Sequence, residues 1–280
     1  IKKLNFFKRN LSLFFPSILF NNISYTSSYP KVIISCGKHT AYFANFLKKK
    51  MKKEIVSIFI QKPPIKTRNF DIVISPKHDK CEGKNIIKTN GALTKINKNY
   101  VRDINKKKKS PLLKKKFVAV LIGGQSRHHT FTNDVLEEIK KRLLIIVKKY
   151  RYNFLIFFSR RTGKKNEYFL RNNLKNKKFI FISNKSKKIS YLEAISLAQA
   201  IIVSSDSVSM VSEACSTGKS IYLIDIPTKS KKFALFIKNL IDLKLINLFK
   251  NTISLKNNNN ALNDTEYTVK KIKKKFNFFR

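Results

Sequence analysis

The sequence predicts an α/β protein made of two Rossmann-like domains, each built around a parallel sheet. Short apolar segments alternate with helical or polar segments at the spacing of crossover connections, which is typical of parallel strands. The alternation stops at a polar, lysine-rich stretch between Thr94 and Lys116, and then restarts. A chain of 280 residues, 42% of them hydrophobic, is long enough for two separate cores. We expect an N-terminal domain with the linker over 1–110, a second domain over 111–255, and a basic tail with a terminal helix over 256–280.

The N-terminal domain is expected to contain four strands and one amphipathic helix. The first strand runs into the loop Cys36–Thr40, and the helix that follows has Phe43, Phe46 and Leu47 on one side. We expect the domain to lack its opening strand–helix units. The expected elements are Lys31–Ser35, the helix Ala41–Lys50, Glu54–Ile60, Phe70–Ser75 and Ile86–Thr89.

The second domain repeats the pattern after the linker. Its strands are expected at Phe117–Ile122, Asn153–Phe158, Phe179–Ile182, Ile201–Val203 and Ile221–Ile226. Its helices are expected at Thr132–Tyr150, Lys165–Leu174, Tyr191–Gln199 and Ala234–Leu243, with a last basic helix at Glu266–Phe279. We expect Ile221–Ile226 to close the sheet.

The net charge of +44 is typical of proteins that bind nucleic acid or anionic membranes. The lysines occur together with many Asn, Ile, Phe and Tyr residues, all encoded by A/T-rich codons, so a biased genome explains them without a partner. Peripheral contact with an anionic membrane stays open, because clustered lysines attract such lipids. No nucleic-acid partner is expected, because no recognised binding module accompanies the charge.

The cysteines and the apolar segments indicate the cellular compartment in which the protein is expected. Cys36, Cys81 and Cys215 show neither disulfide nor metal spacing, which suits a reducing environment, and the histidines form no metal-ligand pattern. No segment approaches the roughly 20 apolar residues of a membrane span. We expect a cytoplasmic protein, at most peripheral at the inner face of a membrane, with no metal site.

The stretch Ile201–Lys219 combines a strand, a polar turn and a short helix. Asp206 or Ser207 could cap that helix, and its start at a strand's carboxyl end offers N–H groups and a positive dipole to an anion. Glu213, one turn further on, could accept the hydroxyls of a ribose attached to the anion. Read alone, the same residues could be only a cap and a solvated face. Val208, Val211 and Cys215 should face the sheet, and Ser209, Glu213 and Ser216 should face away.

Three loops leave the carboxyl ends of strands in this domain, where open α/β sheets bind ligands. The pair Gly123-Gly124 would let the backbone approach a ligand closely. Arg160 or Arg161 could donate forked hydrogen bonds to phosphate, and Thr162 and Ser126 could add hydroxyls. Each feature also has an ordinary explanation as a turn or a solvated side chain. Their occurrence at three strand ends favours a nucleoside-diphosphate site.

The segment Ser216–Ser220 resembles the end of a phosphate-binding loop but does not qualify as one. The motif G-x-x-x-x-G-K-[ST] requires glycine where Glu213 stands, and the segment follows a helix and precedes a strand, the reverse of the required order. Gly218 is better explained as the residue that ends the helix.

Six segments resemble the mitochondrial-fission ELM (elongated mitochondria) family over residues 29–250. They are IISCGKHTA at 33–41, FDIVISPKHD at 70–79, T-x-GAL at 89–93, VAVLIGGQS at 118–126, FSRRT at 158–162 and SSDSVSMVSEACSTGKSIYLID at 204–225. Bacterial members of this family are regarded as glycosyltransferases. More remotely, the second half is similar to the nucleotide-sugar half of GT-B enzymes such as the peptidoglycan N-acetylglucosaminyl transferase. The resemblance implies a GT-B-like pair of domains that face each other across a cleft.

The resemblance also implies where the ligands would bind. The donor-binding residues would be Gly123, Gly124, Ser126, Arg160, Arg161, Thr162, Asp206, Ser207, Ser209, Met210 and Glu213. Met210 would line the base or ribose pocket. The acceptor-side loop would consist of Ser35, Gly37, Lys38 and Thr40. The G-x-x-G-H loop of the family does not precede Lys31, so we expect the segment that carries it to be missing. A chain without that loop would be inactive if the loop supplies the acceptor-side base.

The sequence therefore predicts a metal-independent glycosyltransferase whose donor substrate is a nucleoside-diphosphate sugar, with no cofactor. A lipid-linked or envelope glycan is the expected kind of acceptor, and no residue is assigned as catalytic base. The alternative is a non-catalytic adaptor at a membrane surface, the role with which eukaryotic members of the family are associated.

Overall fold

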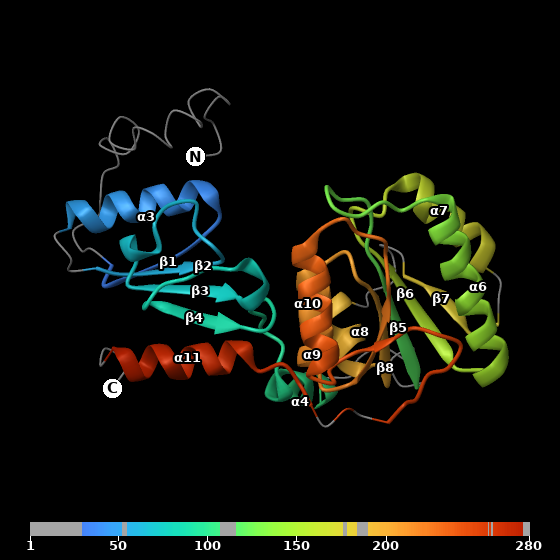
Figure 1. Cartoon of the computed structure of the whole chain (residues 1–280). Coiled ribbons are helices and arrows are strands. Elements are labelled where there is room, and N and C mark those ends of the chain that lie inside the picture. Colours follow the sequence, from blue (N-terminus) through green and yellow to red (C-terminus); the bar gives the residue numbers. More distant parts are fainter. Residues whose placement is uncertain are drawn as a thin grey trace. The chain divides into compact units, whose positions relative to one another are not determined.

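The computed structural model describes residues 30–51, 55–106, 116–175, 178–183, 190–256, 258 and 260–276 (Figure 1). The chain divides into two compact units: unit 1 comprises residues 1–89 and 268–280, and unit 2 comprises residues 90–267. The division falls after Thr89, earlier than the expected boundary at 110. The helix α11 (Asp264–Lys275) begins in unit 2 and ends in unit 1.

Unit 1 is a four-stranded parallel sheet in the order β1-β2-β3-β4. Helix α3 (Lys38–Lys50) lies on one face, where its small residues Ala41 and Ala44 are buried against Phe59 and Val73. The strands are β1 (Val32–Cys36), β2 (Val56–Ile60), β3 (Ile72–Pro76) and β4 (Ile86–Thr89), and the 3-10 turns are η1 (Thr67–Asn69) and η2 (Lys77–Asp79). The four predicted strands are confirmed. Glu54, expected in the second of them, lies outside the described residues.

Unit 2 is a six-stranded parallel sheet in the order β10-β9-β8-β5-β6-β7. The strands are β5 (Phe117–Ile122), β6 (Asn153–Phe158), β7 (Ile180–Ile182), β8 (Ala200–Ser204), β9 (Ser220–Ile224) and β10 (Asn247–Leu248). The chain builds outward from β5 through β6 to β7, and then returns to the other side of β5 to start β8. The strand order therefore reverses between β5 and β8, and such a switch point is where open α/β sheets bind ligands.

Helices cover both faces of the unit 2 sheet (Figure 1). Alternate residues of β5 supply the two cores: Val118 and Val120 pack under α6 and α7, while Ala119 and Leu121 face the core that α8, α9 and α10 cover. This two-sided burial explains the unbroken apolar strands. The helices are α4 (Lys98–Lys106), α6 (Asn133–Tyr150), α7 (Lys164–Leu174), α8 (Tyr191–Leu197), α9 (Val208–Ser216) and α10 (Lys231–Asp242). The α/β class with parallel sheets is confirmed.

The expected linker between Thr94 and Lys116 contains helix α4, which corrects that prediction. Val101 is buried in the unit 2 core, and the partly buried Tyr100 and Ile104 pack beside it. Asn97 caps this helix by accepting a hydrogen bond from the N–H of Tyr100 at 2.8 Å. The apolar face of α4 is short and is surrounded in the sequence by lysines and asparagines, so the polar composition of the segment predicted a linker instead of a helix.

Two further predictions about unit 2 are wrong. Strand β9 does not close the sheet, because β10 pairs with it on its outer side. Ser216 does not share the outward face of α9 but is buried, and its Oγ donates to the carbonyl of Ser212 at 2.8 Å. Gly218 does end α9 as predicted, since its φ of 72° lies in the left-handed region that glycine adopts readily. Across the described part of the chain, no helix has the length and apolar character needed to cross a bilayer.

Candidate functional site

The three predicted loops of unit 2 meet at the switch point between β5 and β8. Asp206, which follows β8, is the residue that joins them. Its carboxylate is fully buried and accepts hydrogen bonds from Ser204 Oγ at 2.6 Å, from the N–H of Gly124 at 3.1 Å and from Arg161 Nη2 at 2.8 Å. These donors come from the end of β8 and from the loops after β5 and β6. A buried carboxylate needs such partners, so Asp206 fixes the loops to one another.

The paired glycines make room for this junction. A Cβ atom on Gly123 would lie 1.9 Å from Oδ1 of Asp206, and one on Gly124 would lie 1.9 Å from the carbonyl oxygen of Arg161. The N–H of Gly123 donates to Ser204 Oγ at 2.7 Å. The two glycines therefore allow the neighbouring loops of the protein, rather than a ligand, to approach closely. Both of their N–H groups already donate hydrogen bonds within the protein.

The two neighbouring arginines have different surroundings. Arg161 is held by Asp206, although its side chain is still 40% exposed. Arg160 is exposed, and its guanidinium has no hydrogen bond or ion pair within the described residues. Thr162 is buried, and its Oγ1 accepts from the N–H of Ser159 at 3.0 Å and lies 3.1 Å from the carbonyl oxygen of Ile122. Arg160 is thus the available cation, whereas Thr162 and Arg161 shape the loop.

The start of helix α9 offers further groups to an anion. Ser207, not Asp206, is its N-cap and accepts from the N–H of Met210 at 3.4 Å. Ser209 is exposed, and Met210 is partly buried against the core. Within the part of the chain that the structure describes, the N–H groups of Val208 and Ser209 have no acceptor. They point out of the helix end that carries its positive dipole.

Glu213 lies one turn further along α9 and is half buried. Its Oε2 accepts a hydrogen bond of 2.7 Å from the hydroxyl of Tyr191, the first residue of α8. The sequence alone did not single out Tyr191. Only its place inside the capping box, between Ser190 and Glu193, could have suggested a fixed position.

Ser126 organises its own loop. Its Oγ accepts from the N–H groups of His128 and His129 at 3.2 and 3.1 Å, and it lies 3.2 Å from Nδ1 of His129. The His129 ring is buried edge-on against Phe233, with ring centroids 4.4 Å apart. Burial holds the pKa of His129 below its usual value, and the neighbouring His128 and Arg161 act in the same direction, while Asp206 and Asp225 oppose them. Sequence reasoning missed His129, which lies in the loop after β5 close to the charges of Asp206 and Arg161.

The predicted acceptor-side residues lie in unit 1, at the carboxyl end of β1. Gly37 has φ of 98°, which ends β1 and starts α3. Thr40 Oγ1 lies within donating distance of the carbonyl oxygens of Cys36 and Gly37, at 2.7 and 2.9 Å. Lys38 is exposed, while Ser35 Oγ is buried and has no partner within the described residues. Of these residues, Lys38 is the most accessible to a ligand.

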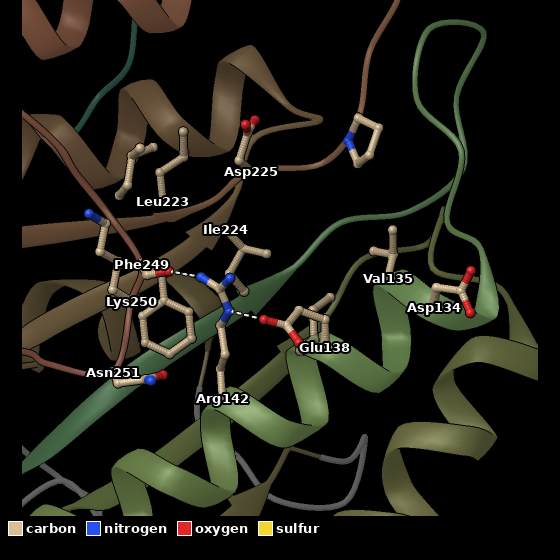
Figure 2. Close-up of a pocket in the computed structure, with 13 residues that line it drawn as sticks. Asp134, Val135, Glu138, Arg142, Leu223, Ile224, Asp225, Phe249, Lys250 and Asn251 are labelled. Atoms are coloured by element: carbon tan, nitrogen blue, oxygen red, sulfur yellow. Dashed lines mark hydrogen bonds and ion pairs between the residues drawn. The ribbon is translucent and has the colours of Figure 1, made fainter.

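Unit 2 also contains a cavity of about 680 Å³ that the predicted donor residues do not line. It lies between α6, the end of β9 and the segment after β10, and Figure 2 shows Arg142 at its centre. Arg142 donates to Glu138 Oε1 at 2.5 Å and to the carbonyl oxygen of Phe249. No three His, Cys, Asp or Glu side chains in the described ranges come together as metal ligands would. The expectation of a metal-independent reaction stays a prediction.

The sequence profile of the family described as "Mitochondrial fission ELM1" matches residues 15–276. The chain belongs to this family. It is 29% identical over 261 residues to the uncharacterized protein RP120 of Rickettsia prowazekii, covering 81% of this chain and 73% of that protein. It is 24% identical over 251 residues to the mitochondrial fission protein ELM1 of Arabidopsis thaliana, covering 81% of this chain but only 58% of that protein. The predicted resemblance is confirmed.

Solved structures with the same fold include enzymes of nucleotide-sugar metabolism. The UDP-GlcNAc 2-epimerase of Methanocaldococcus jannaschii aligns with a TM-score of 0.56 and 15% identity, over 95% of this chain and 81% of the enzyme. The UDP complex of S. aureus MnaA aligns with a TM-score of 0.55 and 12% identity, over 98% of this chain and 83% of that chain. At these identities the likeness shows a GT-B-like fold alone, and that part of the prediction is confirmed.

Proposed function

We propose that this member of the ELM1 family binds a nucleoside-diphosphate sugar in unit 2 and transfers its glycosyl group to an acceptor. The observation that carries the proposal is the convergence of the loops after β5, β6 and β8 on Asp206 at the switch point of the sheet. That junction holds Arg160 and the start of α9 at one edge of the sheet. Both favour a negatively charged ligand.

The proposed roles follow from which groups the protein leaves available. Arg160, Ser209 and the N–H groups at the start of α9 would bind the diphosphate, and Glu213 would accept hydrogen bonds from the ribose. Gly123, Gly124, Arg161, Thr162 and Asp206 would fix the loops rather than touch the ligand. Met210 would line the base or ribose pocket.

The proposed reaction breaks the bond between the anomeric carbon and the diphosphate oxygen and forms a bond to an acceptor hydroxyl. The hydroxyl proton is released, and the nucleoside diphosphate leaves with the electron pair. Arg160 and the positive end of α9 would stabilise the charge that grows on the departing diphosphate. This chemistry needs no cofactor.

UDP and UDP-GlcNAc are the first ligands to test, since solved structures of this fold contain them. We expect calorimetric titration to detect binding by the wild type and a loss of at least tenfold in Arg160→Ala and in Glu213→Ala. Arg102→Ala is the matched control: it removes an exposed arginine of α4, beside Gly218 at the far end of α9. Absence of binding to UDP- and GDP-sugars, or equal binding by all variants, would contradict the proposal.

The second candidate function is that of a non-catalytic adaptor at a membrane surface. It is supported by the match to the ELM1 family and by the net charge of +44. It predicts binding to vesicles that contain anionic lipid, weakened by salt because the charges are screened, without affinity for nucleotide. Co-sedimentation with anionic and neutral vesicles at low and high salt distinguishes the two functions.

A further inference from the structure

The hydrogen bond between Tyr191 and Glu213 connects two helices at the proposed ribose site. Tyr191 is the first residue of α8, and its hydroxyl donates to Oε2 of Glu213 on α9 at 2.7 Å. Burial raises the pKa of Tyr191 above its usual range, and the charge of Glu213 and the hydrogen bond act in the same direction. The phenol therefore keeps its proton and acts as the donor across the physiological pH range.

The Tyr191 ring is held on a rigid support. Ser190 and Glu193 form a capping box at the start of α8, and the following residues Ala194 and Ile195 are fully buried. The ring packs edge-on against Phe157 of β6, with centroids 6.3 Å apart and an interplanar angle of 82°. β6 leads into the loop that carries Arg160, so Tyr191 contacts both the Arg160 strand and the Glu213 helix.

A glutamate on a helix has three rotatable side-chain bonds, and ordering it on binding costs free energy. The bond from Tyr191 fixes one carboxylate oxygen of Glu213 before any ligand arrives. Each carboxylate oxygen can accept two hydrogen bonds, and among the described residues only Tyr191 donates to this carboxylate, so Oε1 and the second lone pair of Oε2 stay available to the two hydroxyls of a ribose.

We propose that Tyr191 is a positioning residue that orients Glu213 to recognise the 2′- and 3′-hydroxyls of the nucleotide ribose. The inference rests on the proposed function, because it requires a nucleotide at this site. Tyr191 would act through Glu213 and would not touch the nucleotide. Its hydroxyl would therefore matter only for ligands whose ribose carries those hydroxyls.

The test compares UDP with 2′,3′-dideoxy-UDP, and GDP with its dideoxy analogue in parallel, by calorimetric titration of the full chain. We expect the wild type to prefer the ribonucleotide by at least tenfold. Tyr191→Phe should lose about tenfold in affinity for the ribonucleotide and keep its affinity for the dideoxy analogue. In a Glu213→Ala background, which removes the acceptor of the Tyr191 hydroxyl, Tyr191→Phe should have no further effect. Tyr168→Phe is the matched control, since it removes an exposed phenol hydroxyl from α7.

The outcomes separate the inference from the function on which it rests. If the wild type binds none of the nucleotides, the proposed function fails and the role of Tyr191 fails with it. If the wild type prefers the ribonucleotide and Tyr191→Phe keeps the same preference, or loses affinity for both ligands equally, only the role of Tyr191 is overturned. A general loss of packing would weaken the binding of both ligands. The ratio of the affinities for the ribonucleotide and the dideoxy analogue therefore distinguishes a positioning role of Tyr191 from an effect on stability.

Discussion

Arg160 and Arg161 are adjacent in the loop after β6, and substitution of each should have a different effect because the partners of their guanidinium groups differ. The sequence offered Arg160 and Arg161 as alternatives, and nothing in their order distinguishes them. In the structure, Arg161 is bound to the buried carboxylate of Asp206, and Arg160 is exposed. Similarly, Asp206 and Ser207 were equivalent candidates for the cap of α9, and Ser207 takes that place.

The two arginines should therefore differ in a stability measurement. Arg161→Ala leaves the Asp206 carboxylate buried with one charged donor fewer, and we expect the free energy of unfolding to fall by about 2 kcal/mol. Arg160→Ala removes the same charge from an exposed position and should change the free energy of unfolding by less than about 0.5 kcal/mol. Urea unfolding of both variants measures the difference. Equal values would show that the Arg161–Asp206 pair is not a junction of the loops.

His129 should make stability depend on pH. Its folded-state pKa is lowered, first by burial, so below the ordinary value of 6.5 the unfolded chain takes up a proton that the folded chain does not. This group's contribution is present above pH 6.5 and is lost as the pH falls from there towards the folded-state pKa. We expect His129→Gln to show a smaller loss of stability between about pH 7 and pH 5 than the wild type.

The adjacent histidine provides the control for that measurement. His128 is exposed and is only one of the groups that lower the pKa of His129, so His128→Gln should reduce the slope of stability against pH by less than His129→Gln does. Thermal unfolding at a series of pH values gives the slopes. The assignment to His129 would be refuted by a His129→Gln variant that loses as much stability as the wild type over this range.

At the scale of elements, the T-x-GAL segment has a packing role that the resemblance did not suggest. The N–H of Gly91 donates to Asp264 Oδ2 at 2.7 Å, and the N–H of Ala92 donates to Ser212 Oγ at 2.9 Å. A Cβ atom on Gly91 would lie 2.4 Å from that Oγ, so a side chain there would displace the Ser212 hydroxyl from its hydrogen bond to Ala92. The segment therefore joins the start of α11 to α9, the helix that carries Glu213.

Removal of the charge on Asp264 should loosen this connection. Asp264 is buried, and its carboxylate also accepts from the N–H of Asn90 at 3.1 Å. We expect Asp264→Asn to lower the free energy of unfolding by about 2 kcal/mol, because hydrogen bonds to a charged group are lost in a buried place. Asp242→Asn removes an exposed charge paired with Lys238 and should cost less than about 1 kcal/mol. Urea unfolding measures the free energy of unfolding of both variants. Similar losses in the two variants would contradict a specific role for Asp264.

The elements that the sequence predicted well are those whose apolar pattern is strong. The central strands of unit 2 appear as unbroken apolar runs because helices bury them on both faces, as β5 shows with six buried residues. The pattern failed for α4, whose single buried residue is Val101, and for β10, which has two exposed residues. Side-chain bonds such as Tyr191 to Glu213 join residues 22 positions apart, and no local pattern encodes them.

At the scale of the whole molecule, the two units differ in how the chain builds them. Unit 2 is one continuous segment, 90–267, whereas unit 1 needs residues from both ends of the chain. Unit 2 has cores on both sides of its sheet and contains every predicted donor residue, from Gly123 to Glu213. A segment with its own core is expected to fold independently.

We therefore predict that a fragment of residues 90–267 folds alone and keeps the nucleotide affinity of the full chain. It retains Asp264 with its partners Asn90 and Gly91, so the contact between its two ends is preserved. Circular dichroism should show cooperative unfolding, and titration with UDP should give an affinity within about threefold of the full chain, since less than 1 kcal/mol would be lost. A cooperatively folded fragment with no affinity, beside a full chain that binds, would show that unit 1 supplies part of the nucleotide site.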